Sequence, residues 1–412
     1  MTSPARAGTG SSQSPAARRA RGAAEVFLVF LRLGLTSFGG PIAHLGYFRA
    51  EFVERRRWLD DRGFSDLVGL CQFLPGPTSS QVGMAIGMLR AGWRGTLGAW
   101  LGFTMPSALL MIAFGYGMTR FGALAQSAAV HGLKVVAVAV VAQAVWAMAR
   151  TLCPDRPRAA LAVGAALLTL VLPTPVAQVG AIAACALAGL HGLHIAPLAH
   201  ESREGFGASR RAGAVALIAF VALLVGLPIA ARLTGSVPLQ GIDGFYRAGA
   251  LVFGGGHVVL PLLQAAVVPT GGVSNEQFLA GYGAAQALPG PLFAFAAYLG
   301  TVMQGALRGW QGGLVFLVAI FLPGWLLIAG ALPFWDDLRR RDRVRAAMAG
   351  VNAGVVGILG AALYDPVWTS AIHTRADFGL ALAAFGLLAV ARVSPFVVVI
   401  VTAAAGWVLG LV

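Results

Sequence analysis

The sequence predicts an all-α polytopic membrane protein made of two inverted-topology repeats with broken, re-entrant half-helices, joined by an extra transmembrane helix. The first observation is composition: of 412 residues 58% are hydrophobic and only 11% charged, with a mean hydropathy of +0.77. A soluble domain carries about a quarter charged residues. Apolar stretches long enough to cross a bilayer recur, for example at 95–118, 127–149 and 212–231.

The second observation is that the chain repeats itself. The segment from Arg32 to Gly40 returns as Arg247 to Gly255, and the run from Gln72 to Pro77 returns as Gln286 to Pro291. Such matches in unbroken order indicate two homologous halves. We predict a disordered basic tail at 1–23, a first transporter repeat at 24–196, a connector at 197–243 with a transmembrane helix at 212–231, and a second repeat at 244–412.

The loop charges indicate how the halves are oriented. Loop 49–62 holds five arginines and its counterpart 268–277 has no Lys or Arg, whereas 119–126 has one arginine and its counterpart 334–345 has five. By the positive-inside rule, equivalent loops then face opposite sides of the membrane. We therefore expect inverted repeats in a bacterial inner membrane, with the N-terminus in the cytoplasm.

The remaining bulk features exclude other classes of protein. The net charge of +14 sits in short basic blocks between apolar segments, not on a basic face interleaved with aromatics, so we expect no nucleic-acid partner. Three cysteines without metal or redox spacing predict neither a disulfide framework nor a cofactor. His191, His194 and His200 have no converging carboxylate or cysteine, so we expect no metal site.

Two helix breaks recur in both halves and point to a central site. Phe38-Gly39-Gly40-Pro41 and Pro75-Gly76-Pro77 interrupt apolar segments, and irregular backbone inside a bilayer is tolerated only where protein or a cavity surrounds it. A half-helix that starts at such a break directs unpaired N–H groups inward and suits an anion. After the first Pro-Gly-Pro come Thr78, Ser79, Ser80 and Gln81, whereas the second is followed by Leu292, Phe293, Ala294 and Phe295. We expect the first half to hold the oxyanion.

Three cations in apolar surroundings are candidates for the same site. Lys134 is the only lysine, and its repeat partner is Asn352; Arg32 and Arg247 precede the two Phe-Gly-Gly breaks. Together they would make a cationic cavity for a small dianion. The alternatives are that Lys134 extends to the membrane surface and that the arginines bind carbonyls freed by the breaks. The candidate substrate-binding residues are Arg32, Phe38, Gly39, Gly40, Gln72, Pro75, Gly76, Pro77, Thr78, Ser79, Ser80, Gln81, Lys134, Arg247, Phe253, Gly254, Gly255, Gln286, Pro289, Gly290, Pro291 and Asn352.

The paired motifs Arg32 to Pro41 and Gln72 to Pro77, with their second-half copies, resemble those of the chromate ion transporter family in its long two-domain form. The resemblance covers nearly all of 24–412. It implies an inner-membrane exporter of chromate that confers chromate resistance and draws on the membrane potential or an ion gradient without ATP. The chain agrees in having no phosphate-binding P-loop. It departs in having Gly256 where the first half has Pro41.

Several alternatives stay open at this point. Sulfate and other small oxyanions share the charge and geometry of chromate, so they are the nearest alternative substrates. An intramembrane enzyme would need a nucleophile with a base or a carboxylate pair at membrane depth, and neither is apparent. A passive channel would differ from a carrier in lacking a saturable rate. The expected partners are an oxyanion and the lipid bilayer, and a homodimer is compatible with the sequence.

Overall fold

The computed structural model describes residues 15–121, 128–193, 209–253, 256–305, 307–335 and 341–408, and every regular element among them is helical. The first half contains α1 (Pro15–Thr36), α2 (Gly40–Arg49), the π-helix η1 (Ala50–Arg55), α3 (Asp61–Phe73), α4 (Thr78–Arg120), α6 (Ala128–Leu152), α7 (Arg156–Val171) and α8 (Pro175–Gly192). The connector contributes α9 (Arg210–Thr234).

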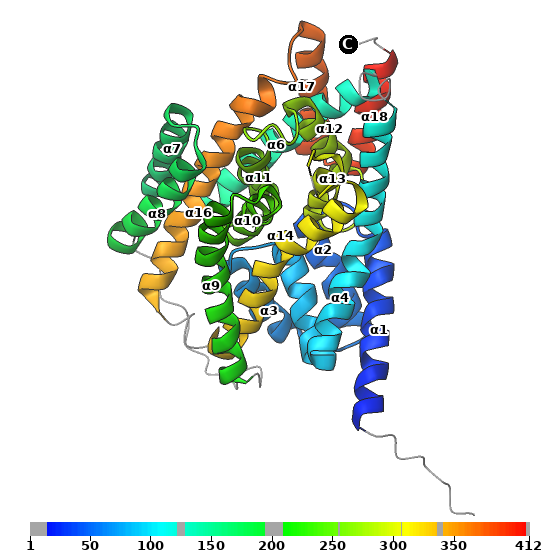
Figure 1. Ribbon diagram of the computed structural model, residues 1–412, viewed down its shortest axis with the longest axis vertical. Coiled ribbons are helices and arrows are strands. Elements are labelled where there is room, and N and C mark those ends of the chain that lie inside the picture. The colour runs from blue at the N-terminus through cyan, green and yellow to red at the C-terminus, as the bar shows by residue number, and fades with distance from the viewer. Residues whose placement is uncertain are drawn as a thin grey trace, which may run out of the picture.

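The second half follows a similar order of elements. It contains α10 (Val237–Ala250), η2 (Gly256–Val258), α11 (Val259–Val267), α12 (Asn275–Gln286), η3 (Leu292–Ala294), α13 (Phe295–Val302), α14 (Gly309–Ala331), η4 (Leu332–Phe334), α16 (Asp342–Ala362), η5 (Leu363–Trp368), α17 (Arg375–Ala389) and α18 (Pro395–Val408). Figure 1 shows these helices packed side by side, with α1 at one edge of the view and α7 and α8 at the other.

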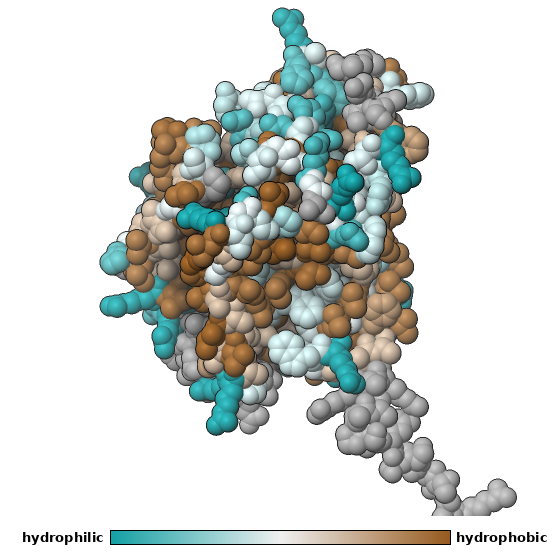
Figure 2. Space-filling view, viewed as in Figure 1, coloured by the Kyte–Doolittle hydropathy of each residue, from teal (hydrophilic) through white to brown (hydrophobic). Residues whose placement is uncertain are grey.

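The helices are those of a polytopic membrane protein, as the composition predicted. Five of the described helices are long and apolar enough to cross a bilayer, and α9 covers the predicted connector helix 212–231. Hydrophobic side chains form a band across the middle of the face seen in Figure 2, and hydrophilic side chains gather above and below it. The first helix begins at Pro15, inside the segment predicted as a tail; residues 1–14 lie outside the described residues.

α4 is a helical hairpin rather than one straight rod. Its backbone leaves the helical region at Ala91 and Gly92, where Gly92 adopts a φ of +62°. A methyl group added at Gly87 would collide with the carbonyl oxygen of Gly95, so the two arms touch where they diverge. In the second half Gly300 and Gly312 make the same contact, between α13 and α14. Each half therefore contains a half-helix that reverses tightly into a long helix.

The two halves exchange helices at their outer ends. α6 packs against α17 and α18 of the other half, and α16 packs against α7 and α8 (Figure 1). At the centre of these crossings Gly132 lies on the backbone of Thr402, and Gly350 lies on the backbone of Cys185. Both crossings rely on the missing side chain, because a Cβ at either position would overlap the facing carbonyl group.

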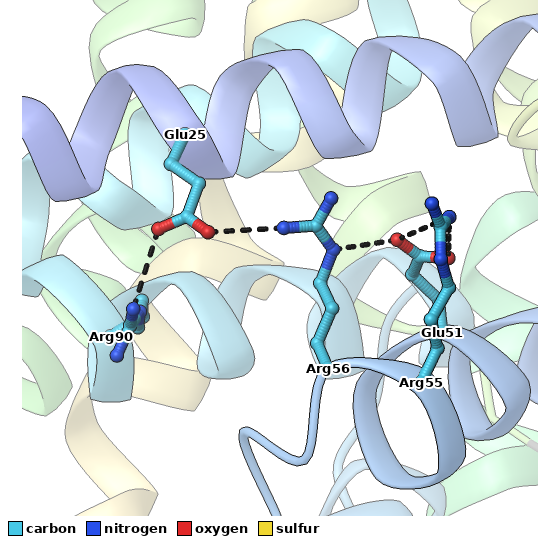
Figure 3. A network of polar contacts seen from close by, with 5 residues as sticks. All are labelled: Glu25, Glu51, Arg55, Arg56 and Arg90. Atoms are coloured by element: carbon cyan, nitrogen blue, oxygen red, sulfur yellow. Dashed lines mark hydrogen bonds and ion pairs between the residues drawn. The ribbon is translucent and has the colours of Figure 1, made fainter.

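The basic loop 49–62 is organised by ion pairs. Glu25 of α1 accepts from Arg90, at the end of the first arm of α4, and from Arg56, which also binds Glu51 (Figure 3). The guanidinium groups of Arg56 and Arg90 both lie over the ring of Trp58, at 5.5 and 5.0 Å from its centroid. This network joins α1, the loop and the hairpin turn at one end of the first half.

Candidate functional site

Two crossed backbone hydrogen bonds join the helix breaks of one half to the Pro-Gly-Pro loops of the other. The amide of Gly76 donates to the carbonyl of Val252 at 2.7 Å, and the amide of Gly290 donates to the carbonyl of Ser37 at 2.9 Å. Val252 directly precedes Phe253, and Ser37 directly precedes Phe38. All four predicted motifs therefore meet in one region.

The glycines of these motifs adopt backbone angles that other residues rarely allow. Gly39 and Gly40 have φ of +101° and +77°, and Gly76 and Gly290 have φ of +127° and +96°. A Cβ built at Gly256 would lie 3.5 Å from Pro41, so the second-half break meets the first-half break at equivalent positions. The breaks are therefore built into the packing of the centre and are not simple kinks within continuous helices.

Buried polar side chains of the first half lie after the end of α1, on α2 and on both arms of α4. The Nδ1 atom of His44 lies 3.2 Å from the Ser79 hydroxyl, and the Gln81 Nε2 donates to the Pro75 carbonyl at 2.8 Å. We call the following set the α4 polar cluster: Ser37, His44, Ser79, Ser80, Gln81 and Thr104. All six side chains are buried.

Five atoms of this cluster have no hydrogen-bond partner among the residues that the structure describes. They are Ser37 Oγ, His44 Nε2, Ser80 Oγ, Gln81 Oε1 and Thr104 Oγ1. Leaving a buried polar group unpaired costs about 1–3 kcal/mol. Five unpaired polar atoms on one side of a protein are therefore unusual for a purely structural core. Ser80 and Gln81 lie in the first turn of the half-helix that forms the first arm of α4, where unpaired N–H groups and the helix dipole suit a small polar anion.

The structure does not bring the three predicted cations into this cluster. Arg32 is exposed on the outer side of α1, on a face with the exposed Leu28 and Leu35. Arg247 binds Asp243 and lines a cleft of about 300 Å³, formed with residues of α8, α9 and α11. The predicted cationic cavity is therefore not present as such in this arrangement, because the two arginines project from α1 and α10 away from the breaks.

Lys134 lies in a separate pocket of about 260 Å³, lined also by Ser274, Glu276 and Gln277 at the start of α12. The pKa of the Glu276 carboxyl is lowered, chiefly by hydrogen bonding from Ser274, and the Lys134 ammonium contributes to this shift. No residue of the α4 polar cluster lines the pocket. Asn352, the repeat partner of Lys134, is half-buried, and its Oδ1 has no hydrogen-bond partner among the described residues.

The other predicted site residues divide between the centre and its edge. Pro77, Pro289 and Pro291 are buried beside the two glycines, and Thr78 is half-buried at the first turn of α4. Phe38 packs on Phe396 of α18, with ring centroids 4.9 Å apart, and Phe253 is half-buried. Gln72 is exposed, whereas Gln286 is half-buried with Nε2 unpartnered. Gly254 and Gly255 lie outside the described residues.

The two halves differ at this centre, as the sequence predicted. Where α4 begins with polar residues, η3 and α13 begin with Leu292 and the buried Phe293 and Phe295. The histidine of the second half, His257, has its Nδ1 2.8 Å from the Tyr282 hydroxyl, in an aromatic environment. Among the described residues, the start of the Pro-Gly-Pro half-helix is therefore polar in the first half and aromatic in the second.

Three members of the cluster were not among the predicted site residues. Ser37 follows Thr36 at the end of α1, within the repeated segment from Arg32 to Gly40, and Thr104 lies on the second arm of α4. His44 lies on α2, and its Nδ1 contacts the Ser79 hydroxyl. Polar residues in apolar segments next to a break are the signal that could have found them.

Broken helices that cross at the centre, with polar groups at one half-helix start, define a polytopic helical protein of the transporter class. The model of the family described as chromate transporter matches residues 24–190 and 239–407. This chain belongs to the chromate transporter family.

Curated relatives agree with this membership. The chain is 30% identical to a chromate transport protein of Pseudomonas aeruginosa over 93% of its own length and 91% of the relative. It is 26% identical to a probable chromate transport protein of Synechococcus elongatus, over 81% and 82% of the two chains. It is also 22% identical to an uncharacterized transporter of Methanocaldococcus jannaschii, over 82% of each chain. No solved structure matches the chain.

Proposed function

We propose that this chain is a secondary active transporter that exports chromate across the inner membrane, driven by the membrane potential or an ion gradient, and so gives chromate resistance. The observation that carries the proposal is the α4 polar cluster, where unpaired buried atoms lie in the first turn of a half-helix that starts beside one of the two crossed hydrogen bonds. The chromate transport proteins among its relatives support chromate as the substrate.

The crossed hydrogen bonds suggest how access could alternate. Each Pro-Gly-Pro loop is tied to the break of the other half, so a rocking motion of one half against the other would move both loops together. The anion would stay at the start of α4 while the path on either side opens in turn. Sulfate or another small oxyanion is the alternative substrate, because such a site would recognise its ligand mainly by shape and charge.

The test is chromate uptake into everted membrane vesicles from cells that express the protein, with and without an uncoupler. We expect saturable uptake above that of empty vesicles, which the uncoupler abolishes. Uptake that does not saturate would favour a channel. No uptake by protein that is shown to be folded and inserted would contradict chromate as the substrate.

A pair of variants links the uptake to the site. Ser80→Ala removes an unpaired hydroxyl of the cluster, and Ser65→Ala removes an exposed hydroxyl on α3. A hydrogen bond to a charged group contributes roughly 1.5–3 kcal/mol, so we expect Ser80→Ala to raise the half-saturating chromate concentration about tenfold or more. Ser65→Ala should leave it unchanged. Equal half-saturating chromate concentrations for the two variants would show that Ser80 does not belong to the site.

A further inference from the structure

The cleft at Arg247 lies between the connector helix and the second half, and we call it the Arg247 cleft. It has a volume of about 300 Å³, and its lining comes from α8, α9, α10 and α11 and from Thr270, which follows the end of α11. Figure 1 shows these four helices together on one side of the molecule. The residues that line it belong neither to the α4 polar cluster nor to the Lys134 pocket. The cleft is therefore separate from the site proposed for the substrate.

Three charged side chains form the polar part of the cleft. Asp243 binds Arg247, one turn further along α10, and the Asp243 side chain is only 6% exposed. Arg232, in the last turn of α9, is exposed and interacts electrostatically with the same carboxylate. Two cations and one anion give this group a net charge of +1. The Asp243 Oδ1 and the Arg247 Nε have no hydrogen-bond partner among the described residues, so the group can still bind a ligand that both accepts and donates.

Most of the remaining lining is apolar, and the surface beside it is apolar too. Val179, Leu251 and Leu262 are among the apolar residues that line the cleft. The helix α9 is apolar along most of its length and largely exposed. Ile229 and Leu233, which adjoin cleft residues on α9, are 52% and 82% exposed. Apolar surface of this extent on a membrane protein contacts the acyl chains of lipids.

The cleft begins where three helices begin or end. The connector helix α9 ends at Thr234, two residues after Arg232, and α10 begins at Val237. Helix α8 begins at Pro175, and Gln178 in its first turn also lines the cleft. The ends of membrane-spanning helices lie at the level of the lipid headgroups, and arginine side chains there extend to the phosphates. The charged part of the cleft is thus placed beside headgroups, and its apolar part beside acyl chains.

From this arrangement we infer that the Arg247 cleft binds an anionic phospholipid of the phosphatidylglycerol type. The lipid phosphodiester accepts hydrogen bonds from Arg232 and Arg247, the headgroup hydroxyls donate to the Asp243 carboxylate, and an acyl chain lies along α9. A lipid with one negative charge balances the net charge of +1, whereas a zwitterionic lipid leaves it in place. A free oxyanion would also match the arginines, but it would gain nothing from the apolar lining. Binding of the lipid does not depend on which substrate the protein transports.

The inner end of the cleft reaches the second-half break. Leu251 lines the cleft and directly precedes Val252, whose carbonyl accepts the hydrogen bond from Gly76. A lipid in the cleft therefore contacts both the connector helix α9 and the end of α10 that leads into the break. It fills the space between them and holds the connector against the second half.

The experiment is native mass spectrometry of the purified protein, titrated with phosphatidylglycerol or with phosphatidylethanolamine of the same acyl chains. We expect the first phosphatidylglycerol to bind at least about fivefold more tightly, which is the contribution of one arginine to binding an anionic lipid. An excess of glycerol phosphate or of chromate should leave the bound lipid in place. Equal affinity for the two lipids, or displacement of the lipid by either free anion, overturns the inference.

A matched pair of variants locates the bound lipid. Arg232→Gln removes one cation of the cleft, and Arg375→Gln removes an arginine at the start of α17, outside the cleft. Both side chains are exposed, so neither change disturbs the packing of the protein. We expect Arg232→Gln to weaken the binding of phosphatidylglycerol about fivefold, with Arg375→Gln retaining the wild-type affinity. An Arg232→Gln protein that binds the lipid as tightly as Arg375→Gln overturns the assignment of the cleft.

A third variant should change the affinity in the opposite direction. Asp243→Asn keeps an oxygen that can accept from Arg247, but it leaves the two cations without their anion. We therefore expect it to bind phosphatidylglycerol more tightly than the wild type, by about the same factor. A folded Asp243→Asn protein with weaker binding contradicts the charge balance of the proposed site. If this variant does not fold, the comparison of Arg232→Gln with Arg375→Gln decides the inference.

Discussion

Gly76 combines an unusual backbone angle with a position directly beside the Gln81 side chain. Its φ of +127° is one that residues with a Cβ rarely adopt, and a Cβ would press on the Gln81 amide. Gly305 has nearly the same angle, +128°, but nothing lies within 4 Å of its Cβ position. The pair separates the cost of backbone strain from the displacement of Gln81.

We expect Gly76→Ala to lower the rate of chromate uptake at least about tenfold relative to Gly305→Ala, the effect of roughly 1.4 kcal/mol. Both variants carry a similar backbone strain of about 1–3 kcal/mol, so Gly305→Ala measures the loss of thermal stability from strain alone, and any larger loss in Gly76→Ala reports the displacement of Gln81. Vesicle uptake and thermal unfolding would be measured on the same preparations. Equal uptake would show that the Gln81 position does not matter for transport.

Lys134 has a role that its sequence position does not decide. Because its pocket also contains Glu276, we expect Lys134→Met to impair chromate uptake by leaving that carboxylate without its nearby cation. The double variant Lys134→Met with Glu276→Gln should then recover uptake at least about threefold over the single variant, since coupled charges contribute roughly 0.5–3 kcal/mol. A double variant as impaired as Lys134→Met would favour direct contact of the lysine with substrate.

These residues show what the sequence could and could not predict. The Pro-Gly-Pro motif predicted where α4 starts. The positions of Ser79, Ser80 and Gln81 in its first turn could be predicted too, because the start of a helix is set by neighbouring residues in the sequence. The places of the cations did not follow from the sequence: a charge in an apolar segment indicates function, but which neighbour it meets depends on the rotation of its helix and on long-range packing. Arg32 and Arg247 are equivalent in sequence, yet only Arg247 has an acid one turn before it, Asp243.

At the scale of elements, glycines set how closely the exchanged helices pack. Gly350 of α16 lies on the Cys185 carbonyl of α8. The equivalent contact at the other crossing, between α6 and α18, joins Gly132 to Thr402. Gly360, on the same helix α16, has nothing within 4 Å of its Cβ position. The sequence indicated the helices themselves, but not this exchange between halves, since nothing local specifies which distant helix fills a glycine groove.

We expect Gly350→Ala to destabilise the protein, because α8 must move away to make room for the methyl group, at a cost of about 1–3 kcal/mol. Gly360→Ala should be neutral or slightly stabilising, since alanine is favoured over glycine in a helix by up to about 1 kcal/mol. The thermal unfolding temperature in detergent checks both. A Gly350→Ala protein as stable as Gly360→Ala would contradict the close packing of α8 on α16.

The ion-pair network of loop 49–62 makes a prediction for pH. Burial alone would raise the pKa of Glu51, but hydrogen bonds from Arg56 and Arg55 outweigh it and hold the pKa below its usual 4.5. A lowered pKa stabilises the folded protein above the usual value, and this contribution is lost as the pH falls through the folded value. Glu51→Gln should therefore unfold at a lower temperature than wild type at neutral pH, and the difference should shrink in acid. A difference that stays constant with pH would exclude an ionised Glu51 as its cause.

At the scale of the whole molecule, the inverted orientation of the halves stays a prediction from the loop charges. Arg62 and Thr270 are exposed residues in or beside the two compared loops, 49–62 and 268–277. The native Cys71 and Cys185 are buried. In a background with Cys153→Ser, we expect a membrane-impermeant thiol reagent to label Arg62→Cys and Thr270→Cys from opposite sides. Labelling of both from the same side would overturn the inverted repeat.

The crossed hydrogen bonds have a consequence for how the protein is made. Val252, which accepts from Gly76, is synthesised 176 residues after it. At about 5–20 residues per second the ribosome needs roughly 10–35 s to reach it. During that time the first Pro-Gly-Pro loop is already in the membrane without its partner, and water, lipid or the insertion machinery must occupy its amide. The contact of the first Pro-Gly-Pro loop with the second half is thus completed only after most of the chain has been synthesised.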